Sequence, residues 1–91
     1  MPVQQTALPF GNARGREEVI RSSVELGAIV RQQRKRLALR QLDIAGPGNT
    51  GNRFIVELEH GKPTLQLQKV LDVMDLLGLE LIVRPKTARG F

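Results

Sequence analysis

The sequence predicts a small all-α protein, a bundle of four to five helices that ends in one short strand. Apolar residues recur at intervals of three and four in several segments, each bounded by Gly, Pro or a capping residue. This pattern is typical of helices with one buried face. With 91 residues the chain is long enough for one domain with a modest core. Only 3% of the residues are aromatic, so the core must rest on Leu, Ile and Val.

The first expected helix begins at Ser22. Ser22 and Glu25 fit a capping box, in which each side chain accepts a hydrogen bond from a free backbone N–H at the helix start. Its buried stripe is predicted to consist of Leu26, Ile29, Val30 and Leu37.

Two shorter helices are expected next, with a glycine-rich connection between them. Residues 40–46 can bury Ile44, and the Pro-Gly pair after them cannot continue a helix. The segment NRFIVELE at 52–59 resumes the helical period, with Ile55 and Leu58 facing inward.

A fourth helix is expected after the turn HGKP, where Gly61 supplies a positive φ. Thr64 is its predicted N-cap and Gly78 its end. The buried stripe of this helix is predicted to consist of Leu67, Val70, Leu71, Met74 and Leu77.

Residues 79–84, LELIVR, alternate apolar and polar side chains with the period of a strand. A lone strand leaves its backbone groups unpaired, and the chain offers only a weak second candidate, REEVI at 16–20. The same segment of a second copy is the other possible partner. We therefore expect a homodimer whose contact includes Leu79, Leu81, Ile82 and Val83.

The composition points to a polyanionic partner. The net charge is +5 and the pI about 10.8, which favours nucleic acid first and an anionic membrane surface second. No apolar run reaches the ~18 residues of a membrane helix, and Cys is absent, so we expect a cytoplasmic protein. Residues 1–15 are expected to be a flexible arm, 16–85 the DNA-binding and dimerisation domain, and 86–91 a flexible tail.

The stretch GPGNTG, residues 46–51, matches the dinucleotide-binding pattern G-x-G-x-x-G. That pattern needs a strand before it, whereas a helix is expected here, so we disfavour nucleotide binding. A helix-turn-helix fits better. Counted from Gln41 as the first position, the small Ala45 is fifth and Asn49, which tolerates positive φ, is ninth.

The segment from 22 to 85 resembles the DNA-binding domain of the Xre/Cro family of phage-type repressors, most closely the HipB-type antitoxins. The stretches RFIVELEHGKPT and LQLQKVLDVMDLLGLEL carry most of the similarity. The resemblance implies a lambda-repressor-like helix-turn-helix bundle that dimerises, binds double-stranded operator DNA and represses its own operon. It also implies a HipA-type kinase toxin as a partner.

Three departures from the family pattern are expected to weaken local stability. Arg40 stands where Thr or Ser usually caps the second helix. Pro47 and Gly48 replace residues that would extend it. Gly51 occupies the usual cap of the recognition helix and leaves Thr50 as a possible substitute.

In this interpretation the exposed residues at the start of the recognition helix contact bases. Asn52 can pair with adenine, Arg53 with guanine, and Val56 can touch a thymine methyl. An almost equally good interpretation is that Arg53 contacts only phosphate. Phosphate contacts are expected from Arg40, Gln41, Asn49, Thr50 and Lys62.

The resemblance also assigns a structural ion pair to Arg34 and Glu59, linking the first and third helices. No residue pattern indicates an enzyme, a metal site or a cofactor: His60 is the single histidine, and Glu57 and Glu59 point apart on a helix. The alternatives are a stand-alone Xre-type regulator, a toxin-capping protein with little DNA affinity and, least favoured, an anionic-lipid binder.

Overall fold

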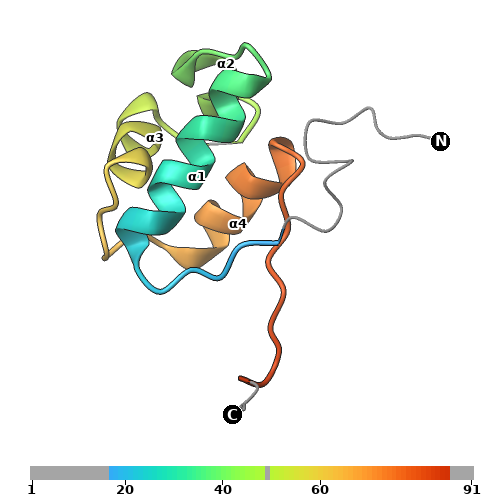
Figure 1. The fold of residues 1–91 in the computed structure, drawn as a ribbon. Helices are drawn as coiled ribbons and strands as arrows, with labels where there is room; N and C mark the ends of the chain where they lie inside the picture. Colours follow the sequence, from blue (N-terminus) through green and yellow to red (C-terminus); the bar gives the residue numbers. More distant parts are fainter. Residues whose placement is uncertain (1–16, 49, 87–91) are drawn as a thin grey trace, which may run out of the picture.

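The computed structural model describes residues 17–48 and 50–86, and these residues form four helices (Figure 1). They are α1 (Ser23–Arg36), α2 (Gln41–Ala45), α3 (Asn52–Glu59) and α4 (Leu67–Leu76). The expected all-α class is confirmed. Asn49, the arm at 1–15 and all but the first residue of the tail at 86–91 lie outside the described residues.

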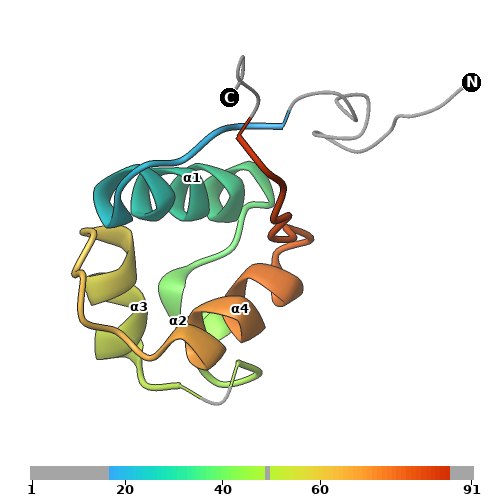
Figure 2. The same cartoon turned by 90° about the horizontal axis from the view of Figure 1, so that it is seen from below.

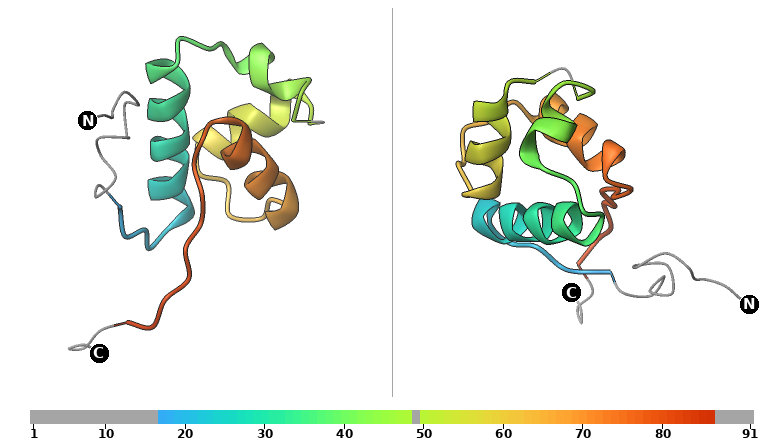
Figure 3. Two further views of the ribbon diagram at one scale, coloured as in Figure 1. Left: turned by 90° about the vertical axis from the view of Figure 1, so that its right-hand side faces the viewer. Right: turned by 90° about the horizontal axis from the view of Figure 1, so that it is seen from above.

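The helix α1 runs along one side of the bundle, and the other three helices lie opposite it (Figure 2; Figure 3, right). Its start is capped as expected, since Ser22 Oγ accepts a hydrogen bond of 3.1 Å from the Glu25 N–H. The Glu25 carboxylate in turn accepts from the backbone N–H of Arg21. The first of these hydrogen bonds satisfies a donor that the helix itself leaves unpaired, and the second ties the residue before the cap to the first turn.

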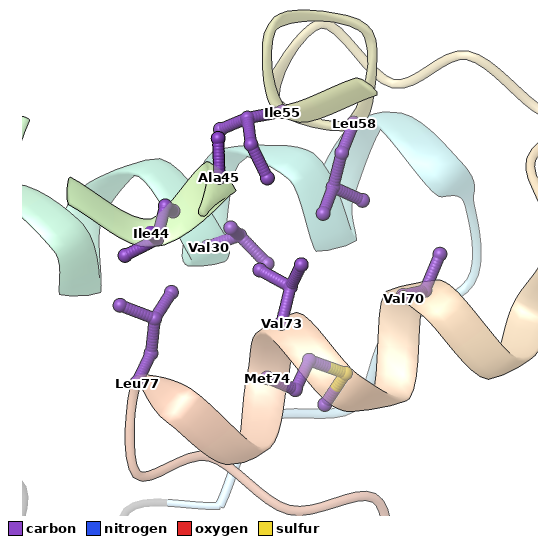
Figure 4. Close-up of a cluster of buried hydrophobic side chains, with 9 residues drawn as sticks. All are labelled: Val30, Ile44, Ala45, Ile55, Leu58, Val70, Val73, Met74 and Leu77. Carbon is purple, nitrogen blue, oxygen red and sulfur yellow. The ribbon is translucent and has the colours of Figure 1, made fainter. Parts of the chain in front are cut away.

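The core consists of apolar side chains from all four helices and the residue after α4 (Figure 4). Packing of these side chains fixes the orientation of α3, because the inner side of this short helix is anchored in the core. The buried apolar residues are Val30, Ile44, Ala45, Ile55, Leu58, Val70, Val73, Met74 and Leu77.

The start of α4 differs from the prediction. Thr64 is not the N-cap, because the helix begins at Leu67 after Gln66, and Gln66 makes no side-chain capping bond. Leu67 is 63% exposed, since the first turn of α4 extends past the edge of the core. Val73, which the predicted stripe omitted, is fully buried.

Two glycines allow α1 and α3 to pack closely. A Cβ on Gly27 would overlap the backbone carbonyl oxygen of Leu58, so α1 carries no side chain where it crosses α3. Gly61, in the turn after α3, has φ +85° as predicted, and a Cβ there would lie 2.6 Å from Val24 Cα. Ser23 Oγ donates a 2.7 Å hydrogen bond to the Gly61 carbonyl and closes the same contact.

Residues 79–86 leave the bundle as an extended tail (Figure 3, left). Within 17–48 and 50–86 the single chain forms no strand, so the predicted strand at 79–84 and its pairing across a dimer stay predictions. Leu79 packs against the core of its own chain. By contrast, Leu81 and Ile82 are each 54% exposed and Val83 is 89% exposed.

Candidate nucleic-acid interface

The first turn of α3 is exposed on the side away from the core. Asn52 and Arg53 lie on the surface there, and the Arg53 side chain is 89% exposed. Val56, one turn along the helix, is half-buried. The opposite side of α3 carries Ile55 and Leu58, both buried. A firmly packed helix therefore presents two polar side chains capable of bidentate hydrogen bonds.

In the free protein, Arg53 is held by a neighbour on its own helix. Its Nε lies 3.2 Å from Glu57 Oε2, and Lys62 Nζ lies 3.4 Å from the same oxygen. The hydrogen bond from Arg53, followed by that from Lys62 and the charges of both, lowers the pKa of Glu57 despite some desolvation. Surface ion pairs of this kind exchange readily, so an anionic ligand can compete with Glu57 for both cations.

Behind this surface, Arg34 and Glu59 form the expected ion pair, which is bidentate. Arg34 Nε lies 2.6 Å from Glu59 Oε2, and Nη2 lies 3.0 Å from Oε1. The guanidinium also donates to the Leu39 carbonyl at 2.9 Å. Gln41 Nε2 donates to Glu59 Oε1 at 3.2 Å, so one carboxylate connects α1, α3 and the first residue of α2.

Burial and hydrogen bonding oppose one another at Glu59. Burial raises its pKa, but the hydrogen bonds from Arg34 and Gln41, with the charges of Arg34 and Arg31, outweigh it. The pKa of Glu59 therefore lies below its usual value, and the carboxylate stays ionised. The hydrogen bond with Glu59 likewise raises the pKa of Arg34, in spite of burial.

The start of α2 is satisfied without a Ser or Thr cap. Arg40 has no capping side chain, but the Asp43 carboxylate accepts a 2.7 Å hydrogen bond from the Arg40 backbone N–H. The Arg40 guanidinium holds the same carboxylate at 3.0 Å. This side-chain bond first, and the backbone bond second, lower the pKa of Asp43. This role of Asp43 was not predicted from the sequence, although an acidic residue three positions after a cap is a known signal.

The GPGNTG stretch connects α2 to α3, and α2 precedes it where a nucleotide site would need a strand. Gly48 is buried, and a Cβ on it would lie 2.8 Å from the Ile44 carbonyl oxygen and 3.2 Å from Leu76 Cδ1. Glycine at this position therefore permits close packing of the loop against α4. The cap proposed for Thr50 is wrong, because its hydroxyl donates back to the Ala45 carbonyl at 3.4 Å.

The other residues expected at the interface lie at two ends of the helix-turn-helix. Arg40 and Gln41 lie at the start of α2, and Lys62 follows α3. Thr50 is half-buried beside the start of α3. Asn49, for which a positive φ and a phosphate contact were expected, lies outside the described residues.

Two further features of residues 17–48 and 50–86 bear on function. None of the helices has the length and apolar character needed to cross a membrane. This part of the chain also contains no group of three or more His, Cys, Asp or Glu side chains arranged to hold a metal ion.

Comparison with solved structures identifies the fold. The HipB–O1–O2 complex contains a chain that matches with a TM-score of 0.69, covering 75% of this chain and 99% of that one. A chain of the HipA–HipB–O2–O3 complex matches with a TM-score of 0.70, covering 75% and 96%. Both are 16% identical in sequence, which establishes a shared fold and no more.

Sequence comparison identifies the family. No protein-family model matches the chain. An uncharacterised HTH-type transcriptional regulator of Sinorhizobium fredii, y4mF, is 48% identical over 62 residues, covering 68% of this chain and 82% of the relative. That relative is a regulator, in agreement with the expectation that this chain is not an enzyme. The chain belongs to the helix-turn-helix transcriptional regulators and has the fold found in HipB.

Proposed function

We propose that the protein is a sequence-specific transcriptional repressor that inserts the start of α3 into the major groove of an operator. The observation that carries this proposal is the exposure of Asn52 and Arg53 on a helix whose other side is buried in the core. In helix-turn-helix proteins the N-terminal residues of the second helix meet the base edges.

Each of the interface residues has a role in this proposal. Asn52 pairs with adenine, Arg53 with guanine, and Val56 contacts a thymine methyl. The phosphate contacts that set the register come from Arg40, Gln41, Asn49, Thr50 and Lys62. Arg40 and Lys62 pair with the carboxylates of Asp43 and Glu57, but both cations are exposed and can exchange these partners for phosphate.

The active form is proposed to be a cytoplasmic homodimer joined through residues 79–84. Exposure of Leu81, Ile82 and Val83 in the single chain supports this, since three adjacent apolar residues gain most by being covered. Two-fold symmetry would place the two α3 helices about 34 Å apart, one turn of DNA, and favour palindromic operators.

The finer role we propose is that of an antitoxin to a HipA-type kinase, whose operon it represses. This rests on the fold shared with HipB, which occurs in a complex with HipA and operator DNA. A stand-alone regulator is the second candidate, because the relative at 48% identity is named only as a transcriptional regulator. Co-purification with the product of the adjacent gene distinguishes the two.

The test of DNA binding is a fluorescence-anisotropy titration with the DNA upstream of the protein's own gene. Arg53→Ala should reduce the preference for this DNA over shuffled DNA by about tenfold, because it removes a base contact. Arg40→Ala should weaken both duplexes alike and lower the slope of log Kd against log salt by about 0.9 for each half-site. Unchanged binding by both variants across the salt series would contradict this surface.

A further inference from the structure

An open hollow of about 680 Å³ lies where the second half of α1, the start of α2 and the end of α3 meet. Arg34 and Glu59, bound to each other, form part of its lining, so their charges offset each other. The hollow is lined by Arg31, Arg34, Lys35, Leu39, Arg40, Gln41, Glu59 and His60.

The rest of the lining is strongly cationic. Arg31 and Lys35 are exposed and stand four residues apart, so they lie on one side of α1. Neither forms an ion pair with any residue in 17–48 or 50–86. Arg40 completes the group, and its own partner, Asp43, does not line the hollow. Two or three like charges around a concave surface have a strong preference for a compact anion.

The hollow lies at the end of α3 opposite to Asn52 and Arg53, which suits an anion of the DNA backbone when those two residues face the bases. With eight residues, α3 is about 12 Å long, and the major groove is about 8.5 Å deep. When Asn52 and Arg53 reach base edges, the far end of α3 lies at the level of the groove edge, where the phosphates run. Glu59 and His60, which line the hollow, are at that end.

We propose that this hollow is a phosphate pocket in which Arg31, Lys35 and Arg40 together hold one backbone phosphate of the operator. The proposal rests on the proposed DNA-binding function and adds α1 to the DNA-contacting surface. The Gln41 side-chain amide offers a donor beside the same phosphate. Its hydrogen bond to Glu59, the partner of Arg34, keeps Gln41 in place.

The test is a thermodynamic cycle between one phosphate and two side chains. The probe is a duplex that the protein selects from a random-sequence library, with single phosphates replaced in turn by neutral methylphosphonates. The test variant is Arg31→Gln/Lys35→Gln. Its control is Arg21→Gln/Lys86→Gln, which removes the same charge from exposed sites outside the four helices.

One phosphate in each half-site should stand out in the scan. Its replacement should raise the Kd of the wild type and of the control by about tenfold, but that of Arg31→Gln/Lys35→Gln by less than about twofold. The test variant should also bind the unmodified duplex about 100-fold more weakly, because both half-sites lose the contact, with the same preferred sequence.

The possible failures are distinct. If wild-type protein selects no duplex, the proposed DNA-binding function is overturned, and the pocket falls with it. If every methylphosphonate raises the Kd of the test variant by the same factor as that of the wild type, only the phosphate pocket is overturned. Inorganic phosphate identifies the other source: saturable binding of it that needs Arg31 and Lys35, without any effect in the scan, would assign the hollow to free phosphate and overturn the backbone contact.

Discussion

The contact between α1 and α3 differs from the C-terminal tail at 79–86. The side chains of the first region are buried or paired within one chain, whereas those of the second are largely exposed. At the α1–α3 contact, Gly27 lies against the backbone of α3. Arg34 and Glu59 form an ion pair there, and their side chains are only 9% and 2% exposed. The tail has apolar side chains of which one, Val83, is 89% exposed. The first region is therefore stabilised by the fold itself, whereas the second leaves apolar surface uncovered within one chain. Changes in the two regions should affect different measurements.

The largest effect on stability should come from filling the space at Gly27. Gly27→Ala places a methyl group against the carbonyl oxygens of Leu58 and Glu59 and should lower the free energy of unfolding by about 3 kcal/mol. Urea denaturation followed by circular dichroism measures it. Gly46→Ala is the matched control, because Gly46 has φ −64° and open space around its Cβ. Equal stability of the two variants would mean that α1 and α3 do not cross as described.

A smaller loss is expected from breaking the ion pair. Glu59→Gln leaves the Arg34 guanidinium without its counter-charge and should lower the free energy of unfolding by about 2 kcal/mol. Glu57→Gln removes a half-buried carboxylate two positions away that pairs only with the exposed ends of Arg53 and Lys62, and it should leave the denaturation midpoint unchanged. A destabilisation by Glu57→Gln as large as that by Glu59→Gln would refute the distinction between the two carboxylates.

The same ion pair should make stability depend on pH in acid. The pKa of Glu59 is lowered in the folded state, so its contribution is complete above the usual glutamate pKa of about 4.5. That contribution is lost as the pH falls from there through the folded-state pKa. Between pH about 5 and 3 the wild type should therefore lose more stability than Glu59→Gln. Parallel pH profiles for the two proteins would show that this carboxylate is not paired.

The smallest effect on the fold, and the largest on assembly, is expected in the tail. Val83→Lys should change the free energy of unfolding by less than about 0.5 kcal/mol at concentrations where the protein is monomeric, because Val83 makes little contact with its own chain. The dimer dissociation constant, measured by sedimentation equilibrium, should rise by at least about tenfold. An unchanged dimer dissociation constant would mean that the interface lies outside residues 79–84.

The same contrast explains which features were predictable from the sequence. Ser22 at the helix start and the stripe at Ile55 and Leu58 were recognisable because helix capping and helical periodicity are local. The Arg34–Glu59 pair, 25 residues apart, came only from the family resemblance, since spacing alone does not indicate contact.

The incorrect or missed features have physical causes of their own. Thr64 is a good capping residue, but the chain turns for two residues more before α4 begins, and Leu67 consequently lies outside the core. The hydrogen bond that the Arg40 backbone N–H donates to Asp43 was overlooked because Arg40 is itself a poor cap. Alternation at 79–84 indicates an extended segment, but it cannot supply the second strand that a sheet requires.

The most direct test asks whether Asn52 and Arg53 contact bases from the start of α3. In this experiment the wild type and Arg53→Ala each select DNA sites from one random library. The wild type should select a two-fold symmetric site. Arg53→Ala should select the same site with the preference lost at one base pair in each half. An identical consensus for both proteins, with full preference at every position, would contradict these base contacts.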